Sequence, residues 1–68
     1  MTRREFISEL GKLLHRADKH ISLSLMDKGN AVCVVCEKLN TCVATPIDIT
    51  GDGKMTIANK ILKVIIAE

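Results

Sequence analysis

The spacing of apolar residues changes at Ile21 from a helical period to a strand period, and this change constrains the fold strongly. Before Ile21 the apolar residues recur every three or four positions and form one stripe, which comprises Phe6, Ile7, Leu10, Leu13, Leu14 and Ala17. Thr2 and Glu5 have the spacing of a capping box, so we predict a helix that begins directly after Thr2. The basic residues Lys19 and His20 suit its C-terminal end.

From Ile21 to Leu25, large aliphatic residues alternate with serine, which predicts a strand buried on one face. Residues 27–30 have the composition of a turn, and residues 31–37 continue as a valine-rich strand. If residues 28 and 29 form a two-residue loop, the predicted partners are Leu25 with Val32, Leu23 with Val34, and Ile21 with Cys36. That register sets each large residue of the first strand opposite an apolar partner.

The second half of the sequence predicts one more strand and one more helix. Residues 39–41 turn the chain, and residues 42–50 follow as a strand that lies at a sheet edge or is broken at Pro46, because proline donates no amide. The segment from Thr56 to Ala67 has helical spacing but many β-branched residues, and Thr56 as an N-cap favours the helix. We therefore predict one α+β domain over residues 1–68, with the order α-β-β-β-α and a three-stranded antiparallel sheet.

The composition weakens two classes of function. Phe6 is the only aromatic residue, whereas single-strand nucleic-acid binders stack bases on aromatic rings and tight interfaces favour Trp and Tyr. A net charge of +2, from ten basic and eight acidic residues, is too balanced to establish a polyanionic partner. An aliphatic surface for self-association remains compatible with this composition.

The cysteines and the apolar runs bear on the compartment. Three cysteines are an odd number, and the chain opens with helix-capping residues rather than an apolar leader. The longest apolar runs are far below the roughly 20 residues of a membrane span. We therefore expect a cytoplasmic protein with reduced thiols and without a membrane partner.

The segment from Asp48 to Asn59 resembles the calcium loop of the dockerins and EF-hand proteins. It has oxygen-bearing residues at the first, third, fifth, ninth and twelfth positions and glycine at the sixth. The resemblance implies a Ca²⁺ site whose side-chain ligands are Asp48, Thr50, Asp52, Thr56 and Asn59. The same residues also fit a strand end, a glycine turn and a helix start, and this second interpretation is our main expectation.

Three cysteines give a second candidate metal site. Cys33 and Cys36 have the spacing of a zinc knuckle, and Cys42 follows nearby. The intervening Val-Val pair is poor at turns, and in a strand the two thiols lie roughly 10 Å apart on opposite faces. We therefore expect these cysteines to pack in the core rather than to bind Zn²⁺.

The predicted order of elements resembles the double-stranded RNA-binding domain. That family presents a glycine-containing loop and the start of its second helix to phosphates. The resemblance implies nucleic-acid contacts from basic residues at this loop and on the two helices, namely Lys54, Lys60, Lys63, Arg3, Arg4, Lys12 and Arg16. In place of the lysine cluster of the family, this helix start carries Met55, Ile57 and Ala58.

No catalytic arrangement is found in the sequence, so we expect a protein that is not an enzyme. No phosphate loop or dinucleotide fingerprint is present, and the histidines lie only around the first helix. The last helix has an unusually wide apolar arc, which must meet more than one neighbour. We predict a small regulator or inhibitor, of the kind phages and mobile elements also carry, that binds protein and forms a homo-oligomer. Its predicted contact residues are Ile57, Ile61, Leu62 and Ile66.

Overall fold

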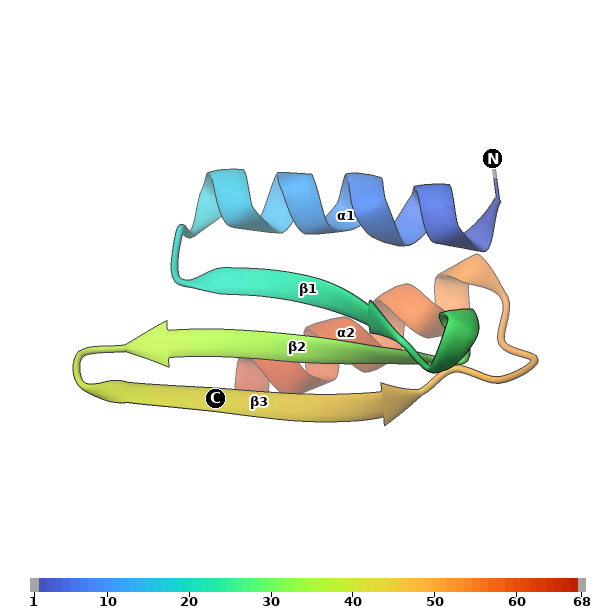
Figure 1. Ribbon diagram of the computed structural model, residues 1–68. Helices are drawn as coiled ribbons and strands as arrows, with labels where there is room; N and C mark the ends of the chain where they lie inside the picture. The colour runs from blue at the N-terminus through green and yellow to red at the C-terminus, as the bar shows by residue number, and fades with distance from the viewer. Residues whose placement is uncertain (1, 68) are drawn as a thin grey trace.

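Two helices and three strands follow one another in the predicted order (Figure 1). The computed structural model describes residues 2–67. Its elements are α1 (Arg3–Ala17), β1 (Ile21–Met26), a short 3-10 turn η1 (Asp27–Gly29), β2 (Ala31–Lys38), β3 (Thr41–Asp48) and α2 (Lys54–Ala67). The α-β-β-β-α prediction is confirmed.

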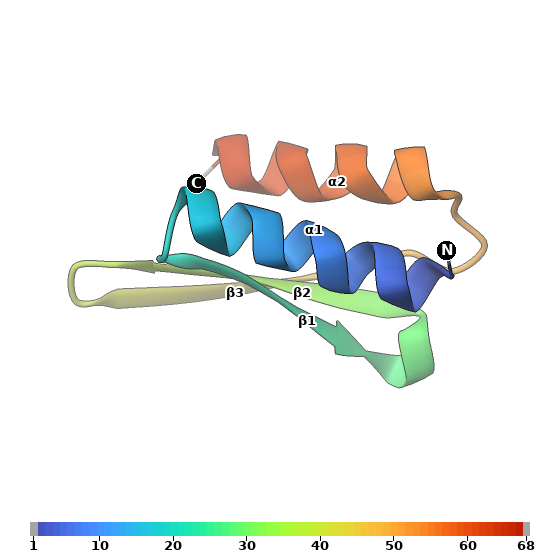
Figure 2. The same cartoon turned by 90° about the horizontal axis from the view of Figure 1, so that it is seen from above.

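The strands form one antiparallel sheet with β2 in the centre and β1 and β3 at its edges. Both helices cover the same face of this sheet and run side by side in the same direction (Figure 2). The first helix packs on β1, and α2 packs on β2 and β3. No described helix covers the opposite face, and neither α1 nor α2 is long and apolar enough to cross a membrane.

The core lies between the helices and the sheet. Seven residues are almost completely buried there: Ile7, Val32, Val34, Cys36, Ile49, Ile57 and Ile61. From Val32 to Cys36, every second residue of β2 belongs to this set, because successive side chains of a strand point to opposite faces. Gly11 marks the place where α1 approaches β1, since a Cβ there would lie 3.5 Å from Leu23 Cβ.

The first hairpin has the predicted register but a different loop. Ile21 pairs with Cys36, Leu23 with Val34 and Leu25 with Val32. The loop comprises the four residues 27–30 rather than two, and the last strand pair is Met26 with Ala31. Positive φ angles at residues 27, 28 and 29 wind it into a tight turn, and Gly29 carries the largest of them, at 94°.

The capping box at Thr2 is confirmed. The Glu5 N–H donates to Thr2 Oγ1 over 3.1 Å, and the Thr2 N–H donates to the Glu5 carboxylate over 3.4 Å. At the other end, α1 stops at Ala17 with Asp18 as its C-cap. Lys19 and His20 lie directly after this C-cap, next to the C-terminal end of the helix.

The bounds of the third strand and of the last helix differ from the prediction. The strand runs from Thr41 to Asp48, not over 42–50, because Ile49 leaves it to enter the core. The last helix begins at Lys54, and the Gly53 carbonyl accepts its first helical hydrogen bond, from Ile57 N–H. Thr56 thus lies inside the first turn, so the prediction of Thr56 as N-cap was wrong.

Pro46 lies on an edge strand, as its missing amide requires. The Ile49 N–H donates to the Asn30 oxygen over 2.9 Å, which fixes the alternation of hydrogen-bonded pairs between β2 and β3. In this alternation Cys33 and Pro46 form a non-hydrogen-bonded pair. The nitrogen of Pro46 therefore faces the open edge of the sheet, and the ladder loses no hydrogen bond.

Candidate functional site

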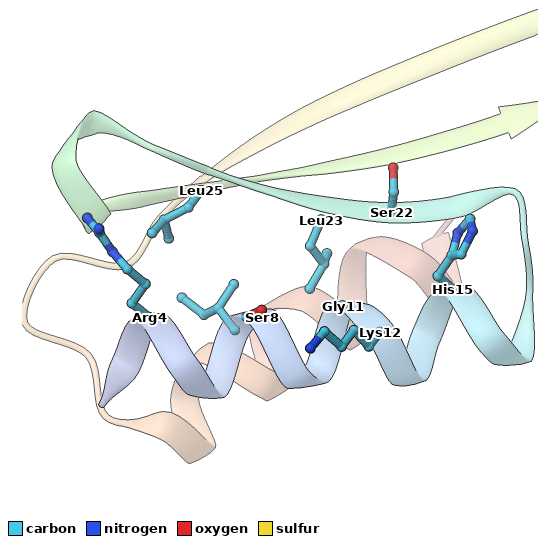
Figure 3. A pocket seen from close by; sticks show the side chains of 9 residues that line it. Arg4, Ser8, Gly11, Lys12, His15, Ser22, Leu23 and Leu25 are labelled. Carbon is cyan, nitrogen blue, oxygen red and sulfur yellow. The ribbon is translucent and has the colours of Figure 1, made fainter. Parts of the chain in front are cut away.

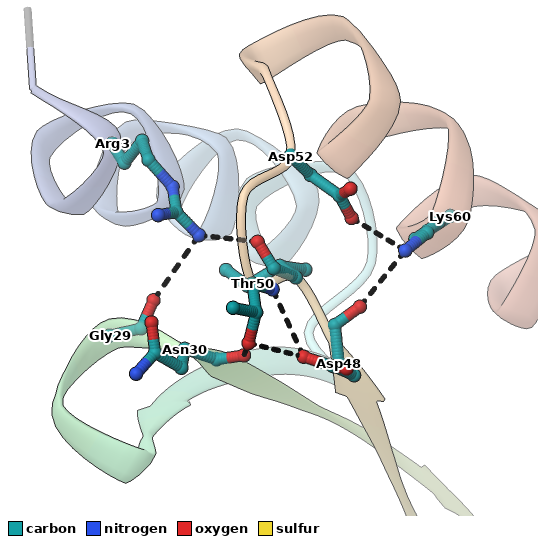
Figure 4. A network of polar contacts seen from close by, with 8 residues as sticks. Arg3, Gly29, Asn30, Asp48, Thr50, Asp52 and Lys60 are labelled. Atoms are coloured by element: carbon teal, nitrogen blue, oxygen red, sulfur yellow. Dashed lines mark hydrogen bonds and ion pairs between the residues drawn. The ribbon is translucent and has the colours of Figure 1, made fainter.

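The loop after β3 is held by contacts within the chain (Figure 4). Lys60 Nζ lies 2.5 Å from Asp52 Oδ2 and 3.0 Å from the main-chain oxygen of Asp48. The Lys60 ammonium thus contacts the carboxylate of Asp52 and the main-chain oxygen of Asp48, and both residues belong to the predicted calcium loop. Thr56 and Asn59, the remaining predicted ligands on α2, have exposed side chains.

Asp48 and Thr50 form a compact polar turn at the end of β3. Asp48 Oδ1 accepts the Thr50 hydroxyl over 2.7 Å and the Thr50 N–H over 3.0 Å. These hydrogen bonds, the hydroxyl first and then the amide, lower the pKa of Asp48, and the charge of Lys60 acts in the same direction. This carboxylate therefore works as the acceptor of a turn.

The three cysteines are free thiols in different surroundings. Cys36 belongs to the core, Cys33 lies half-buried on the opposite face of the sheet, and Cys42 is exposed on β3. The predicted separation of Cys33 from Cys36 by strand alternation is thus observed. The expectation of core packing holds for Cys36 and was wrong for Cys33 and Cys42, because they lie on the other face of the sheet and on its exposed edge strand. Within residues 2–67, no three His, Cys, Asp or Glu side chains are grouped as metal ligands.

Two of the predicted nucleic-acid contacts take part in the fold. Arg3 Nη2 donates to the main-chain oxygens of Ile49, over 2.5 Å, and of Gly29, over 3.4 Å (Figure 4). Lys60 is engaged with Asp48 and Asp52 as described above. Arg3 and Lys60 therefore join separate segments of the chain, a role that the sequence did not reveal.

The other predicted basic contacts are exposed but spread over both helices. Lys12 lies 3.4 Å from Glu9 in an exposed ion pair. The remaining four have exposed side chains, two on α1 and two on α2: Arg4, Arg16, Lys54 and Lys63. The structure thus distributes the seven predicted residues between internal contacts, an ion pair and separate surfaces.

The predicted contact residues of α2 divide into two pairs. Ile57 and Ile61 are fully buried in the core, whereas Leu62 and Ile66 are 43% and 82% exposed. The sheet and α1 therefore cover only part of the wide apolar arc of α2, and the rest of the arc is exposed. Leu62 and Ile66 lie about one helical turn apart on the outer surface.

Two further large apolar residues are exposed on the helices, and we call the set Leu13, Met55, Leu62 and Ile66 the helix-layer patch. Met55 on α2 is 75% exposed, and Leu13 on α1 is 60% exposed. Met55 precedes Leu62 by two helical turns and shares its side of α2. The C-terminal halves of α1 and α2 lie at the same end of the layer (Figure 2). Leu13 belongs to the predicted apolar stripe of α1, and its exposure shows that this stripe is buried over part of its width only.

A groove of about 410 Å³ lies between α1 and β1 (Figure 3). We call it the β1-edge groove. Its lining comprises Arg4, Ile7, Ser8, Gly11, Lys12, His15, Ser22, Leu23 and Leu25. His15 Nδ1 lies 3.1 Å from the main-chain oxygen of Ile21 and closes one end. The sequence analysis missed this groove, because it depends on how α1 is placed over the edge of the sheet.

Comparisons with protein families, with curated proteins and with solved structures give no match to this chain.

Proposed function

We propose that this protein is not an enzyme and acts by binding protein, with self-association through the helix-layer patch as its first interaction. The observation that supports the proposal is the exposure of Leu62 and Ile66 on α2, together with Leu13 and Met55. Met55, Leu62 and Ile66 share the outer side of α2, and exposed apolar surface of this kind is typical of protein interfaces. A role as a small regulator or inhibitor is compatible with its size.

The size of the patch sets the expected strength of the dimer. Burying one such side chain contributes about 1.5 kcal/mol at the lower end of the usual range. Scaled by the exposed fractions of these four side chains, burial in two copies contributes about 8 kcal/mol, which lies within the range of the cost of association. We therefore expect a dimer whose formation depends on concentration.

We also propose that the protein is located in the cytoplasm. The three cysteines are unpaired, which favours a reducing compartment such as the cytoplasm.

Sedimentation velocity over a range of protein concentrations tests the proposal. We expect the wild type to pass from monomer to dimer as the concentration rises, and the double variant Leu62→Ser/Ile66→Ser to remain monomeric with an unchanged circular dichroism spectrum. The matched control is Met26→Ser/Leu39→Ser, which removes exposed aliphatic side chains outside the patch. A wild type that stays monomeric at high concentration, or a control that also loses the dimer, would contradict the proposal.

A further inference from the structure

The outer edge of β1 carries main-chain groups that face away from the sheet. The Glu37 N–H donates to the His20 oxygen over 2.8 Å, so these two residues form a hydrogen-bonded pair next to β1. Such pairs alternate along an antiparallel ladder, and Ser22 and Ser24 therefore bond to β2. The N–H and C=O groups of the residues between and beyond them, Leu23 and Leu25, point outward.

The contact between His15 and Ile21 supports this assignment independently. Ile21, Leu23 and Leu25 are alternate residues of β1, so their main-chain groups point to the same side. The Ile21 oxygen lies 3.1 Å from His15 Nδ1 on α1. The outward groups of β1 therefore face the β1-edge groove. This edge contains no proline, whereas Pro46 interrupts the open edge of β3.

The wall of the groove that α1 provides is polar and basic, and its floor is apolar. Arg4, Ser8 and Lys12 are the lining residues of this wall, and Figure 3 shows Arg4 extending toward the end of β1. Leu23 and Leu25 form the floor, and none of the lining residues carries a carboxylate. Glu5 and Glu9 lie outside this lining, although Glu9 is 3.4 Å from Lys12. A strand that pairs here needs small or aliphatic side chains toward the floor and acidic side chains toward α1.

We infer that the β1-edge groove binds an extended acidic segment of another protein, which adds to the sheet as a fourth strand beside β1. Main-chain hydrogen bonds to Leu23 and Leu25 supply the pairing, and Arg4 and Lys12 select acidic side chains. The length of the groove, from Ser22 to Leu25, matches about four residues of such a segment.

Charge favours a different protein over a second copy of this chain as the occupant. Neither edge strand of the chain carries a run of acids, since β1 has none and β3 has only Asp48 at its end. The apolar floor and the outward amides also suit a peptide better than a phosphate backbone. This inference concerns a surface separate from the helix-layer patch, so each can fail without the other.

Nuclear magnetic resonance titration with a synthetic peptide provides the test. The probe is a short peptide in which glutamate alternates with valine, and the readouts are the amide shifts and hydrogen exchange of Leu23 and Leu25. We expect both amides to shift and their exchange to slow by about tenfold or more on saturation. A peptide of the same sequence with N-methyl groups on every main-chain nitrogen should not bind, because it lacks pairing donors on both of its edges.

Two double variants separate the groove from general attraction between charges. Arg4→Gln/Lys12→Gln should weaken binding about fivefold, whereas Arg16→Gln/Lys19→Gln removes the same charge outside the groove and should change it less than twofold. Equal losses in the two variants, binding of the N-methylated peptide, or shifts confined to β3 would overturn the inference. The inference would also be overturned if the peptide did not bind at millimolar concentration. The same holds if duplex RNA, but not the peptide, shifted the amide resonances of Leu23 and Leu25.

Discussion

The guanidinium of Arg3 donates to the main-chain oxygen of Ile49 over 2.5 Å, and so joins the first turn of α1 to the segment that leaves β3. A second hydrogen bond reaches Gly29 in the first hairpin loop. Three separate parts of the chain thus meet at one side chain. Its Nε is buried and has no partner within the described residues, so the contacts depend on the terminal nitrogens alone.

Replacing Arg3 is expected to destabilise the fold. Arg3→Met leaves two main-chain carbonyl groups without their donor. A hydrogen bond that involves a charged group contributes up to about 3 kcal/mol to the stability of a protein. We expect a loss of about 1–3 kcal/mol in the free energy of unfolding, measured by urea denaturation. Arg4→Met is the matched control, because Arg4 is exposed, and it should change this free energy by less than about 0.5 kcal/mol. Equal effects of the two variants would refute the structural role of Arg3.

Two threonines at helix starts should respond differently to alanine. Thr2→Ala removes the capping box of α1 and should cost about 1 kcal/mol, which lowers the thermal midpoint by about 4–8 °C. Thr56→Ala should leave the midpoint nearly unchanged, because Thr56 lies exposed inside the first turn of α2. Differential scanning calorimetry compares the two, and a larger effect at Thr56 would place the start of α2 where the sequence first suggested.

The division of α2 into core and surface predicts different costs for the same substitution. Ile61→Val removes one methyl group from a fully buried site and should cost about 0.5–1.5 kcal/mol. Ile66→Val removes the same group from an exposed site and should be neutral in dilute, monomeric solution. Chemical denaturation at low protein concentration measures both, and an equal cost would mean that Ile66 is buried.

The hydrogen bonds from Thr50 predict a pH dependence. Because they lower the pKa of Asp48 in the folded state, they stabilise the protein above the ordinary pKa of an aspartate, and this contribution is lost as the pH falls through the lowered value. Thr50→Val removes the hydroxyl but keeps the N–H, so the pKa of Asp48 should rise part of the way. Carboxyl titration by nuclear magnetic resonance measures the change, and an unaltered pKa would contradict the assigned cause.

Calcium addition tests the alternative function of the loop. Since Lys60 already contacts Asp52 and the Asp48 oxygen, we expect millimolar Ca²⁺ to leave the thermal midpoint of the wild type unchanged. A ligand that binds only the folded state would raise this midpoint. A rise with Ca²⁺ that the chelator EGTA reverses would restore the calcium interpretation, and Asp52→Asn should then abolish it.

The elements with regular apolar spacing could be predicted from the sequence. The stripe of α1 and the alternation in β1 and β2 reflect burial on one face, and burial also fixed the register of Leu23 with Val34. The cap at Thr2 was predictable because its hydrogen bonds are local. The order of the fold therefore follows from short-range patterns.

Features that depend on contacts between distant segments were not predictable in this way. Nothing in the sequence indicated that Lys60 contacts Asp52 or that Arg3 donates to the Ile49 oxygen, because these partners are not their neighbours along the chain. The start of α2 at Lys54 depends on Gly53, which has no side chain with which to signal a cap. The β1-edge groove exists only once α1 lies over β1.

Pro46 makes the two edges of the sheet different, because it lies on β3 and β1 has no proline. A strand cannot pair along β3 with a complete set of main-chain hydrogen bonds, because the proline leaves a gap in that edge. If the β1-edge groove binds a strand as proposed, we therefore expect one bound strand per chain.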